Sequence, residues 1–250
     1  MSSSSYTPLM ERSPILARLD EVRFRFRSFY VVVQALGLLA VCLIVYWAVT
    51  WHDGFAFDNK ARQFNFHPVL MIVGMVYCYG NGVLVYRLFL DAGKCKVKIF
   101  HTVMQCFALL FMILALTAVF KCHIANGAGN LYSVHSWIGL SVFILFTLQF
   151  TMGFTAFLFP KTSEQIRTSL LPIHQFIGLL LSPLIAITII SGITEKLKDI
   201  KNLSSMPGEV LVLNILGIVV VMFFVLIGYL IVSSRYKRYD LQAEYHPMSE

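Results

Sequence analysis

VLVLNILGIVVVMFFVLIGYLIV, residues 210–232, is an unbroken apolar run without a single charged side chain. About 20 apolar residues are enough to cross a bilayer as a helix, so this run predicts a membrane span. Five earlier runs have the same character: Phe29–Trp51, Phe66–Phe89, Ile99–Phe120, Leu131–Phe159 and Ile173–Ile193. Their apolar signal is continuous rather than alternating, which is typical of membrane helices and not of barrel strands. The sequence therefore predicts an all-α membrane protein with six transmembrane helices.

The overall composition agrees with this class. Of the 250 residues, 58% are hydrophobic and 13% are charged, whereas soluble domains are about half apolar and a quarter charged. We expect one transmembrane unit over residues 29–234, flanked by tails at residues 1–28 and 235–250. The first apolar run is too long for the core of a signal peptide and is expected to be retained as an anchor.

Lysine and arginine are unevenly distributed over the segments that join the spans. They gather in both tails and in the second and fourth loops, at Arg12, Arg18, Arg23, Arg25, Arg27, Arg87, Lys94, Lys96, Lys98, Lys161, Arg167, Arg235, Lys237 and Arg238. Because cytoplasmic loops carry the excess of these residues, both tails are predicted to be cytoplasmic. The net charge of +7 is then mainly a topology signal of a chain that lies in a lipid bilayer, and nucleic acid is not an expected partner.

Four histidines recur near the starts of successive spans at nearly even intervals: His67, His101, His135 and His174. Imidazole is costly in hydrocarbon, so an intramembrane histidine is a functional-site hypothesis. Consecutive spans run antiparallel, which places His67 and His135 at the outer level and His101 and His174 at the inner level. Spans two to five would then form a four-helix core with one histidine pair near each face, the two levels roughly 20–25 Å apart.

Two histidines at one level can fill both axial positions of a haem, which leaves no open position and suits electron transfer. Gly139 and Gly178 each follow a histidine by four residues, on the same helix face. Such small residues can simply let helices pack closely, but together with the histidines they favour space cleared for a macrocycle. A proton or metal transporter with a histidine relay is the competing class of function.

The chain resembles the eukaryotic cytochrome b561 family of six-span dihaem proteins over roughly residues 29–238. The resemblance rests on five stretches: FNFHPVLMIVGM (64–75), GNGVLVYR (80–87), KVKIFH (96–101), NLYSVHSWIGL (130–140) and LPIHQFIG (171–178). SGITEKL (191–197) and LLPIH (170–174) look most like the duodenal and lysosomal ferric-reductase branches. The resemblance implies two haem b groups, held by His67 with His135 and by His101 with His174.

The resemblance also implies ascorbate as the cytoplasmic electron donor and, beyond the membrane, either a ferric chelate or monodehydroascorbate as the acceptor. We expect ferric-chelate reduction, with regeneration of intravesicular ascorbate as the alternative. Family members are often homodimers. The family's cytoplasmic basic positions match Arg87, Lys94, Lys98 and Arg167, although Ser169 and Leu171 replace further arginines that some members have. Lys94, Lys98 and His101 would share one helix face if the third helix begins early.

On the outer side, His123 matches a family histidine near the outer substrate, and Asn130 and Tyr132 flank the same entrance. A loop histidine can relay a proton or bind a metal at neutral pH. The tail patterns YTPL (6–9), ERSPIL (11–16) and YHPM (245–248) resemble endosomal sorting signals. They favour an endosome or lysosome membrane over the plasma membrane. Asn202 begins a glycosylation sequon on the predicted outer side.

Overall fold

The fold is that of a computed structural model, which describes residues 14–90, 92–201 and 205–237. Arg12, Arg238, the patterns YTPL and YHPM, most of ERSPIL and the sequon at Asn202 lie outside these residues. Every regular element within the described residues is helical, in the order α1 (Pro14–Trp51), α2 (Lys60–Phe64), α3 (Phe66–Met71), η1 (Ile72–Cys78), α4 (Tyr79–Leu88), α5 (Lys94–Asn126), α6 (Val134–Phe157), α7 (Glu164–Leu197), α8 (Gly208–Val232) and η3 (Ser234–Tyr236).

Six of the helical stretches are long and apolar enough to cross a membrane: 17–51, 60–88, 94–126, 134–157, 164–197 and 208–232. The predicted all-α architecture with six spans is thereby confirmed. Most helices extend beyond the apolar run that identified them, because backbone hydrogen bonding continues into the polar water–membrane boundary. α1 begins at Pro14, well inside the predicted tail, and α7 runs through Pro172 and Pro183 as one helix.

The second span is assembled from several pieces. Asn59 caps α2, its side chain accepting a hydrogen bond from the backbone N–H of Arg62. Between α3 and α4 the backbone is π-helical over Ile72–Cys78. Such segments are rare and are often found at functional sites. This one lies between His67 on α3 and Gly82 on α4, the two positions through which the second span contacts the histidine levels.

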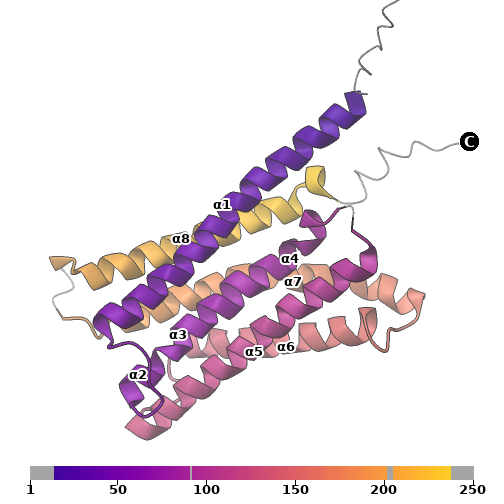
Figure 1. Ribbon diagram of the computed structural model, residues 1–250. Coiled ribbons are helices and arrows are strands. Elements are labelled where there is room, and N and C mark those ends of the chain that lie inside the picture. The colour runs from indigo at the N-terminus through magenta and orange to yellow at the C-terminus, as the bar shows by residue number, and fades with distance from the viewer. Residues whose placement is uncertain (1–13, 91, 202–204, 238–250) are drawn as a thin grey trace, which may run out of the picture.

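The bundle has α1 and α8 side by side on one flank and α5 and α6 on the other, with the second span and α7 between them (Figure 1). Gly80 on α4 permits the close approach of α8, since a Cβ there would stand 2.6 Å from the ring of Phe223. Trp47, Tyr79 and Phe223 are among the largest fully buried side chains. The start of α1 and the end of α8 lie at the same end of the bundle, as an even number of spans requires.

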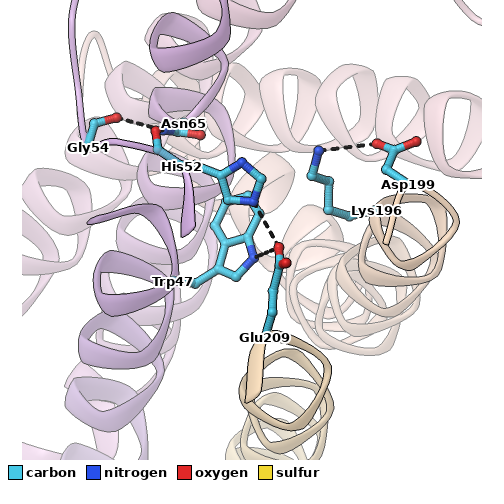
Figure 2. A network of polar contacts seen from close by, with 7 residues as sticks. All are labelled: Trp47, His52, Gly54, Asn65, Lys196, Asp199 and Glu209. Carbon is cyan, nitrogen blue, oxygen red and sulfur yellow. Dashed lines mark hydrogen bonds and ion pairs between the residues drawn. The ribbon is translucent and has the colours of Figure 1, made fainter. Parts of the chain in front are cut away.

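At the opposite end of the bundle, a network of hydrogen bonds links the loop after α1 to α8 and to the second span (Figure 2). Glu209, in the first turn of α8, accepts hydrogen bonds from Trp47 Nε1 at 2.9 Å and from His52 Nε2 at 2.8 Å. Asn65 is fully buried, and its amide donates to the carbonyls of His52 at 2.9 Å and Gly54 at 2.6 Å. The loop after α1 is thus tied both to α8 and to the entrance of the second span.

Candidate functional site

The structure brings the four histidines together as two pairs. The rings of His67 on α3 and His135 on α6 have centroids 6.2 Å apart and planes at 89°. The rings of His101 on α5 and His174 on α7 are also 6.2 Å apart, with planes at 72°. Each pair draws one residue from each of two facing helices, as cofactor sites in helix bundles do.

The spacing within each pair fits a single iron between the two rings. A metal–imidazole nitrogen bond is about 2.0–2.1 Å long, and the nitrogen lies about 1.2 Å from its ring centre. Two imidazoles on opposite sides of one iron therefore have centres about 6.4 Å apart, close to the observed value. Among the described residues, no three or more His, Cys, Asp or Glu side chains gather to hold a bare metal ion. Paired histidines suit a haem, whose porphyrin supplies the other four ligands.

Backbone carbonyls orient three of the four rings. The Nδ1 atoms of His67, His101 and His135 donate to the carbonyls of Ala115 at 3.2 Å, Gly82 at 2.7 Å and Thr188 at 2.9 Å, respectively. Donation from Nδ1 leaves the lone pair on Nε2, which is the arrangement typical of metal-binding histidines. His174 differs, because its buried Nδ1 has no hydrogen-bond partner among the described residues.

The same hydrogen bonds measure the separation of the two levels. Ala115, which accepts from the outer His67, follows the inner His101 on α5 by about four helical turns. Thr188, which accepts from the outer His135, follows the inner His174 on α7 by the same interval. At a rise of 1.5 Å per residue, both helices place the levels about 21 Å apart along their axes.

Two glycines that the sequence analysis did not single out make room for histidine rings. A Cβ at Gly153 on α6 would lie 2.7 Å from Cε1 of His174, and a Cβ at Gly192 on α7 would lie 2.8 Å from Cε1 of His135. Each glycine follows its own helix's histidine by the same interval, about five helical turns. This equal histidine–glycine spacing is present in the sequence, but it indicates a role for the glycines only once α6 and α7 are known to face each other.

Gly139 and Gly178 serve a different purpose. A Cβ at Gly139 would be 3.5 Å from Cγ2 of Thr188, and a Cβ at Gly178 would be 3.5 Å from Nε2 of Gln149. These are ordinary van der Waals distances between α6 and α7. Both glycines thus lie where α6 and α7 pack against each other.

Basic side chains converge beside the inner pair. Lys98 Nζ donates to the carbonyl of Phe157 at 3.3 Å, and the ring of Phe157 lies 5.3 Å from that of His174. The Lys98 ammonium lies close enough to three other cations to be repelled by them: Lys94, Lys161 and Arg167. α5 begins at Lys94, so the early start that places Lys94, Lys98 and His101 on one helix face is found. Lys161 is a member of this cluster that the sequence analysis had not assigned to the site.

Arg87 points elsewhere. Its Nη2 donates to the carbonyl of Ile231 on α8 at 2.5 Å, and the side chain lines a cavity together with Arg23 and Arg27 of α1. The structure therefore groups Lys94, Lys98 and Arg167, and turns Arg87 toward the α1–α8 flank.

At the outer level, His123 on α5 acts electrostatically on His67 and its Nδ1 donates to Oδ1 of Asn130 at 3.1 Å. Tyr132 is 70% exposed in the same loop. Two lysines that the sequence analysis did not assign also lie here.

The Phe64 ring is close both to Lys196 and to His67 of the outer histidine pair. Its ring is 6.1 Å from that of His67, and Lys196 Nζ stands 5.5 Å from the Phe64 ring centre. Lys60 Nζ donates to the carbonyl of Ala125 at 2.6 Å. The positive charges of both lysines lie within electrostatic range of the Cys122 thiol. Lys60 from the second span and Lys196 from α7 therefore form a cationic rim at the outer level, where Lys196 is also paired with Asp199 at 3.1 Å.

Comparison with known proteins identifies relatives over most of the chain. A sequence model described as eukaryotic cytochrome b561 matches residues 66–199. The lysosomal membrane ascorbate-dependent ferrireductase CYB561A3 of Danio rerio is 36% identical over 237 residues, covering 90% of this chain and 96% of that protein. Its Mus musculus counterpart is 38% identical over 216 residues, covering 84% and 89%. The plasma membrane ascorbate-dependent reductase CYBRD1 of Xenopus tropicalis is 36% identical over 218 residues, covering 85% and 77%.

Proposed function

The chain belongs to the eukaryotic cytochrome b561 family, and from this premise we propose that it is a transmembrane ascorbate-dependent oxidoreductase. It takes single electrons from ascorbate on the cytoplasmic side and delivers them to ferric iron in a chelate on the opposite side. The proposal includes two b-type haems, held by His67 with His135 and by His101 with His174. When bound, each haem supplies a one-electron Fe(III)/Fe(II) couple.

The observation that supports this best is the pair of 6.2 Å histidine–histidine distances at two levels of one bundle. These two pairs would hold the haems, and a haem held by two histidines would supply electron transfer rather than binding of a further ligand. A histidine relay for protons or metals would not require two opposed rings at each level, separated by the width of one coordinated iron. The transporter reading therefore has no observation in its favour.

We assign donor binding to the cationic cluster of Lys94, Lys98, Lys161 and Arg167. Ascorbate is an anion at neutral pH, and clustered cations concentrate and orient anionic substrates. The hydrogen bond from Lys98 to the Phe157 carbonyl sets this charge beside the ring that contacts His174. Arg87 stays a predicted donor contact at the margin, and the cavity it shares with Arg23 and Arg27 is a separate feature.

At the outer level, the cationic rim of Lys60 and Lys196 favours an anionic acceptor, such as ferric iron held by a polycarboxylate. His123 and Asn130, joined by a hydrogen bond, would contact the acceptor, and His123 would relay a proton. Tyr132 is exposed at the same entrance. Monodehydroascorbate is also anionic and would use the same rim, so the acceptor has to be decided by experiment.

We further propose that both termini are cytoplasmic and that the chain resides in an endosome or lysosome membrane. The basic inner segments support the orientation. CYB561A3 relatives named as lysosomal support the location, while the CYBRD1 relatives are named for the plasma membrane. Imaging a tagged chain against markers of both membranes tests the location. A homodimer is the proposed assembly, and light scattering of the detergent-solubilised protein tests it.

The first experiment is a visible spectrum of the purified chain, before and after ascorbate, with haem quantified per chain. Two b-type haems reduced by ascorbate are expected. A colourless protein from haem-replete cells would contradict the proposal and return the histidines to the transporter reading.

The acceptor is tested in vesicles loaded with ascorbate that contain the chain with its cytoplasmic face inward. Ferric citrate or monodehydroascorbate is then supplied outside, and the rate of haem reoxidation is followed for each. Faster reoxidation by ferric citrate supports ferric reduction. Faster reoxidation by monodehydroascorbate supports ascorbate regeneration.

A further inference from the structure

α6 and α7 carry matching sets of residue positions, each read from the start of its helix. The two helices are neighbours in the bundle (Figure 1). The set on α6 is His135, Gly139, Gln149 and Gly153, and the set on α7 is His174, Gly178, Thr188 and Gly192. The sequence intervals between successive positions are identical in the two sets. The residue types also agree, except at the third position, where α6 has Gln149 and α7 has Thr188.

Contacts between the two helices follow the same two-fold relation. The glycine in the fourth position of each set faces the histidine ring of the other set, and a Cβ added there would lie 2.7 or 2.8 Å from Cε1. The glycine in the second position of each set faces the third position of the other, at 3.5 Å in both cases. Gln149 and Thr188 are therefore equivalent positions, one at each histidine level.

At the outer level, the third position has a short side chain that bonds within its own helix. Thr188 Oγ1 donates to the carbonyl of Leu184 on α7 at 2.7 Å. The backbone carbonyl of Thr188 accepts a hydrogen bond from Nδ1 of His135, across the interface, at 2.9 Å. A carbonyl of the facing helix thus orients the ring of the outer histidine.

At the inner level, the third position has a longer side chain that crosses to the facing helix. Gln149 is 7% exposed, and its Nε2 donates to the backbone carbonyl of His174 at 2.5 Å. Among the described residues, Nδ1 of His174 and Oε1 of Gln149 are both buried without a hydrogen-bond partner. Gln149 therefore holds the main chain of its histidine, whereas Thr188 accepts from the ring of its histidine.

A second buried glutamine lies on the other side of the inner level. Gln105 follows His101 by one turn on α5 and is 7% exposed, with its Nε2 2.7 Å from the position of a Cβ added at Gly82. The ring of His101 already donates to the carbonyl of Gly82 at 2.7 Å. Gln149 is thus the glutamine that contacts His174, the one histidine of the four whose Nδ1 has no acceptor among the described residues.

We propose that Gln149 is a positioning residue that sets the potential of the inner haem through His174, an inference that rests on the proposed function. By holding the main chain of His174, the amide keeps Nδ1 away from the carbonyl of residue 149, the counterpart of the acceptor at the outer level. A hydrogen bond from Nδ1 to a carbonyl makes an imidazole a stronger base toward a metal. A more basic axial ligand stabilises Fe(III) and lowers the potential. Glutamine at this position therefore gives the inner haem a higher potential than threonine would.

Redox titration of the purified, haem-loaded full chain tests the inference, with electron paramagnetic resonance separating the two haems. The signal of the inner haem is the one that His174→Ala lacks. Gln149→Thr copies the outer level and should lower the reduced-to-oxidised ratio of the inner haem at a fixed potential about tenfold, or about 59 mV for a one-electron couple. The outer haem should keep its potential in this variant.

Two further variants complete the comparison. Thr188→Gln copies the inner level and should raise the reduced-to-oxidised ratio of the outer haem by a similar factor. Thr147→Val is the matched control, because it removes a partly buried hydroxyl of α6 that donates to the carbonyl of Phe143 in the same helix at 2.7 Å. It should leave both potentials at their wild-type values.

Three outcomes in protein that keeps both haems would overturn the inference. They are an unmoved or raised potential of the inner haem in Gln149→Thr, an equal shift of both haems in that variant, and an equally large shift of the inner haem in Thr147→Val. Gln149→Met keeps the length of the side chain and removes its donor, so it provides the test if Gln149→Thr loses the inner haem. It should shift the inner haem in the same direction, and an unmoved potential would count against the inference.

Failure of this inference can be told apart from failure of the proposed function. A wild type without haem would overturn both together. Two haems that ascorbate does not reduce would contradict the proposed function alone. Two haems that ascorbate reduces, with an inner potential that does not respond to Gln149→Thr or Gln149→Met, would overturn this inference alone.

Discussion

Replacing Gly153 by alanine should remove the inner haem and leave the outer one in place. The added Cβ would stand 2.7 Å from Cε1 and 3.2 Å from Nδ1 of His174. Carbon atoms in contact normally keep about 3.5–4.0 Å apart. The imidazole would therefore have to retreat by about 0.8–1.3 Å.

A ligand ring cannot retreat that far and still bind its iron. Metal–ligand distances tolerate deviations of about 0.2 Å, so the required shift exceeds the tolerance at least fourfold. Backbone movement is restricted as well, because Gln149, one turn before Gly153 on α6, donates to the carbonyl of His174 at 2.5 Å. The matching change on α7, Gly192→Ala, places its Cβ 2.8 Å from Cε1 of His135 and should remove the outer haem instead.

The assay is haem per chain, with the reduced spectrum and electron paramagnetic resonance used to tell which haem remains. Gly153→Ala and Gly192→Ala should each fall from two haems to one, with complementary spectra. Gly139→Ala and Gly178→Ala are the matched controls, because their Cβ atoms would meet neighbours at 3.5 Å, and they should retain both haems. Two intact haems in Gly153→Ala, or a haem lost from Gly139→Ala, would refute the reasoning.

Three further predictions concern the donor site, the polar network and the core. Lys98→Gln should raise the KM for ascorbate about tenfold through loss of a charge-assisted contact with kcat little changed, while Lys96→Gln in the same segment should leave both constants near wild type. Glu209→Gln should lower the unfolding free energy by about 1–3 kcal/mol, because it weakens two hydrogen bonds to a carboxylate that is only 14% exposed. Asp199→Asn breaks the exposed ion pair with Lys196 and should lower the unfolding free energy by less than about 1 kcal/mol. If thermal unfolding shows Asp199→Asn to be the more destabilising of the two changes, the stabilising role of the Glu209 network is contradicted. Tyr79→Phe removes a buried hydroxyl that donates to a carbonyl of α7 and should lower the thermal midpoint without changing haem content, so haem loss would show that the tyrosine also shapes a haem site.

The number and kind of spans could be predicted because lipid leaves little choice. A buried backbone in hydrocarbon must satisfy its own hydrogen bonds, so each long apolar run has to be a helix. The pairing of His67 with His135 follows from antiparallel spans and nearly even intervals, and the structure places those rings 6.2 Å apart. Both inferences use only chain direction and length, which are properties of the sequence.

Features that depend on side-chain direction or on a neighbouring helix could not be read in this way. The family's basic positions predict Arg87 as a donor contact beside Lys98, but only the structure gives the direction of its side chain, whose Nη2 donates to the carbonyl of Ile231 on α8. Gly153 and Gly192 acquire their role from a ring on the opposite helix. The π-helical segment at Ile72–Cys78 is not predicted by any feature of the apolar run in which it lies.

The matched intervals on α6 and α7 argue that the two levels are one arrangement used twice. Each helix carries a histidine and, about five turns later, the glycine against which the other helix's histidine rests. A difference in redox potential between the two proposed haems would therefore come from the hydrogen bonds and charges around their histidines. His174 is where the ligands differ, because its Nδ1 has no acceptor among the described residues while the other three rings donate to carbonyls. Such donation makes an imidazole a stronger base toward a metal, so His174 would be the weakest base of the four in the proposed haem ligation.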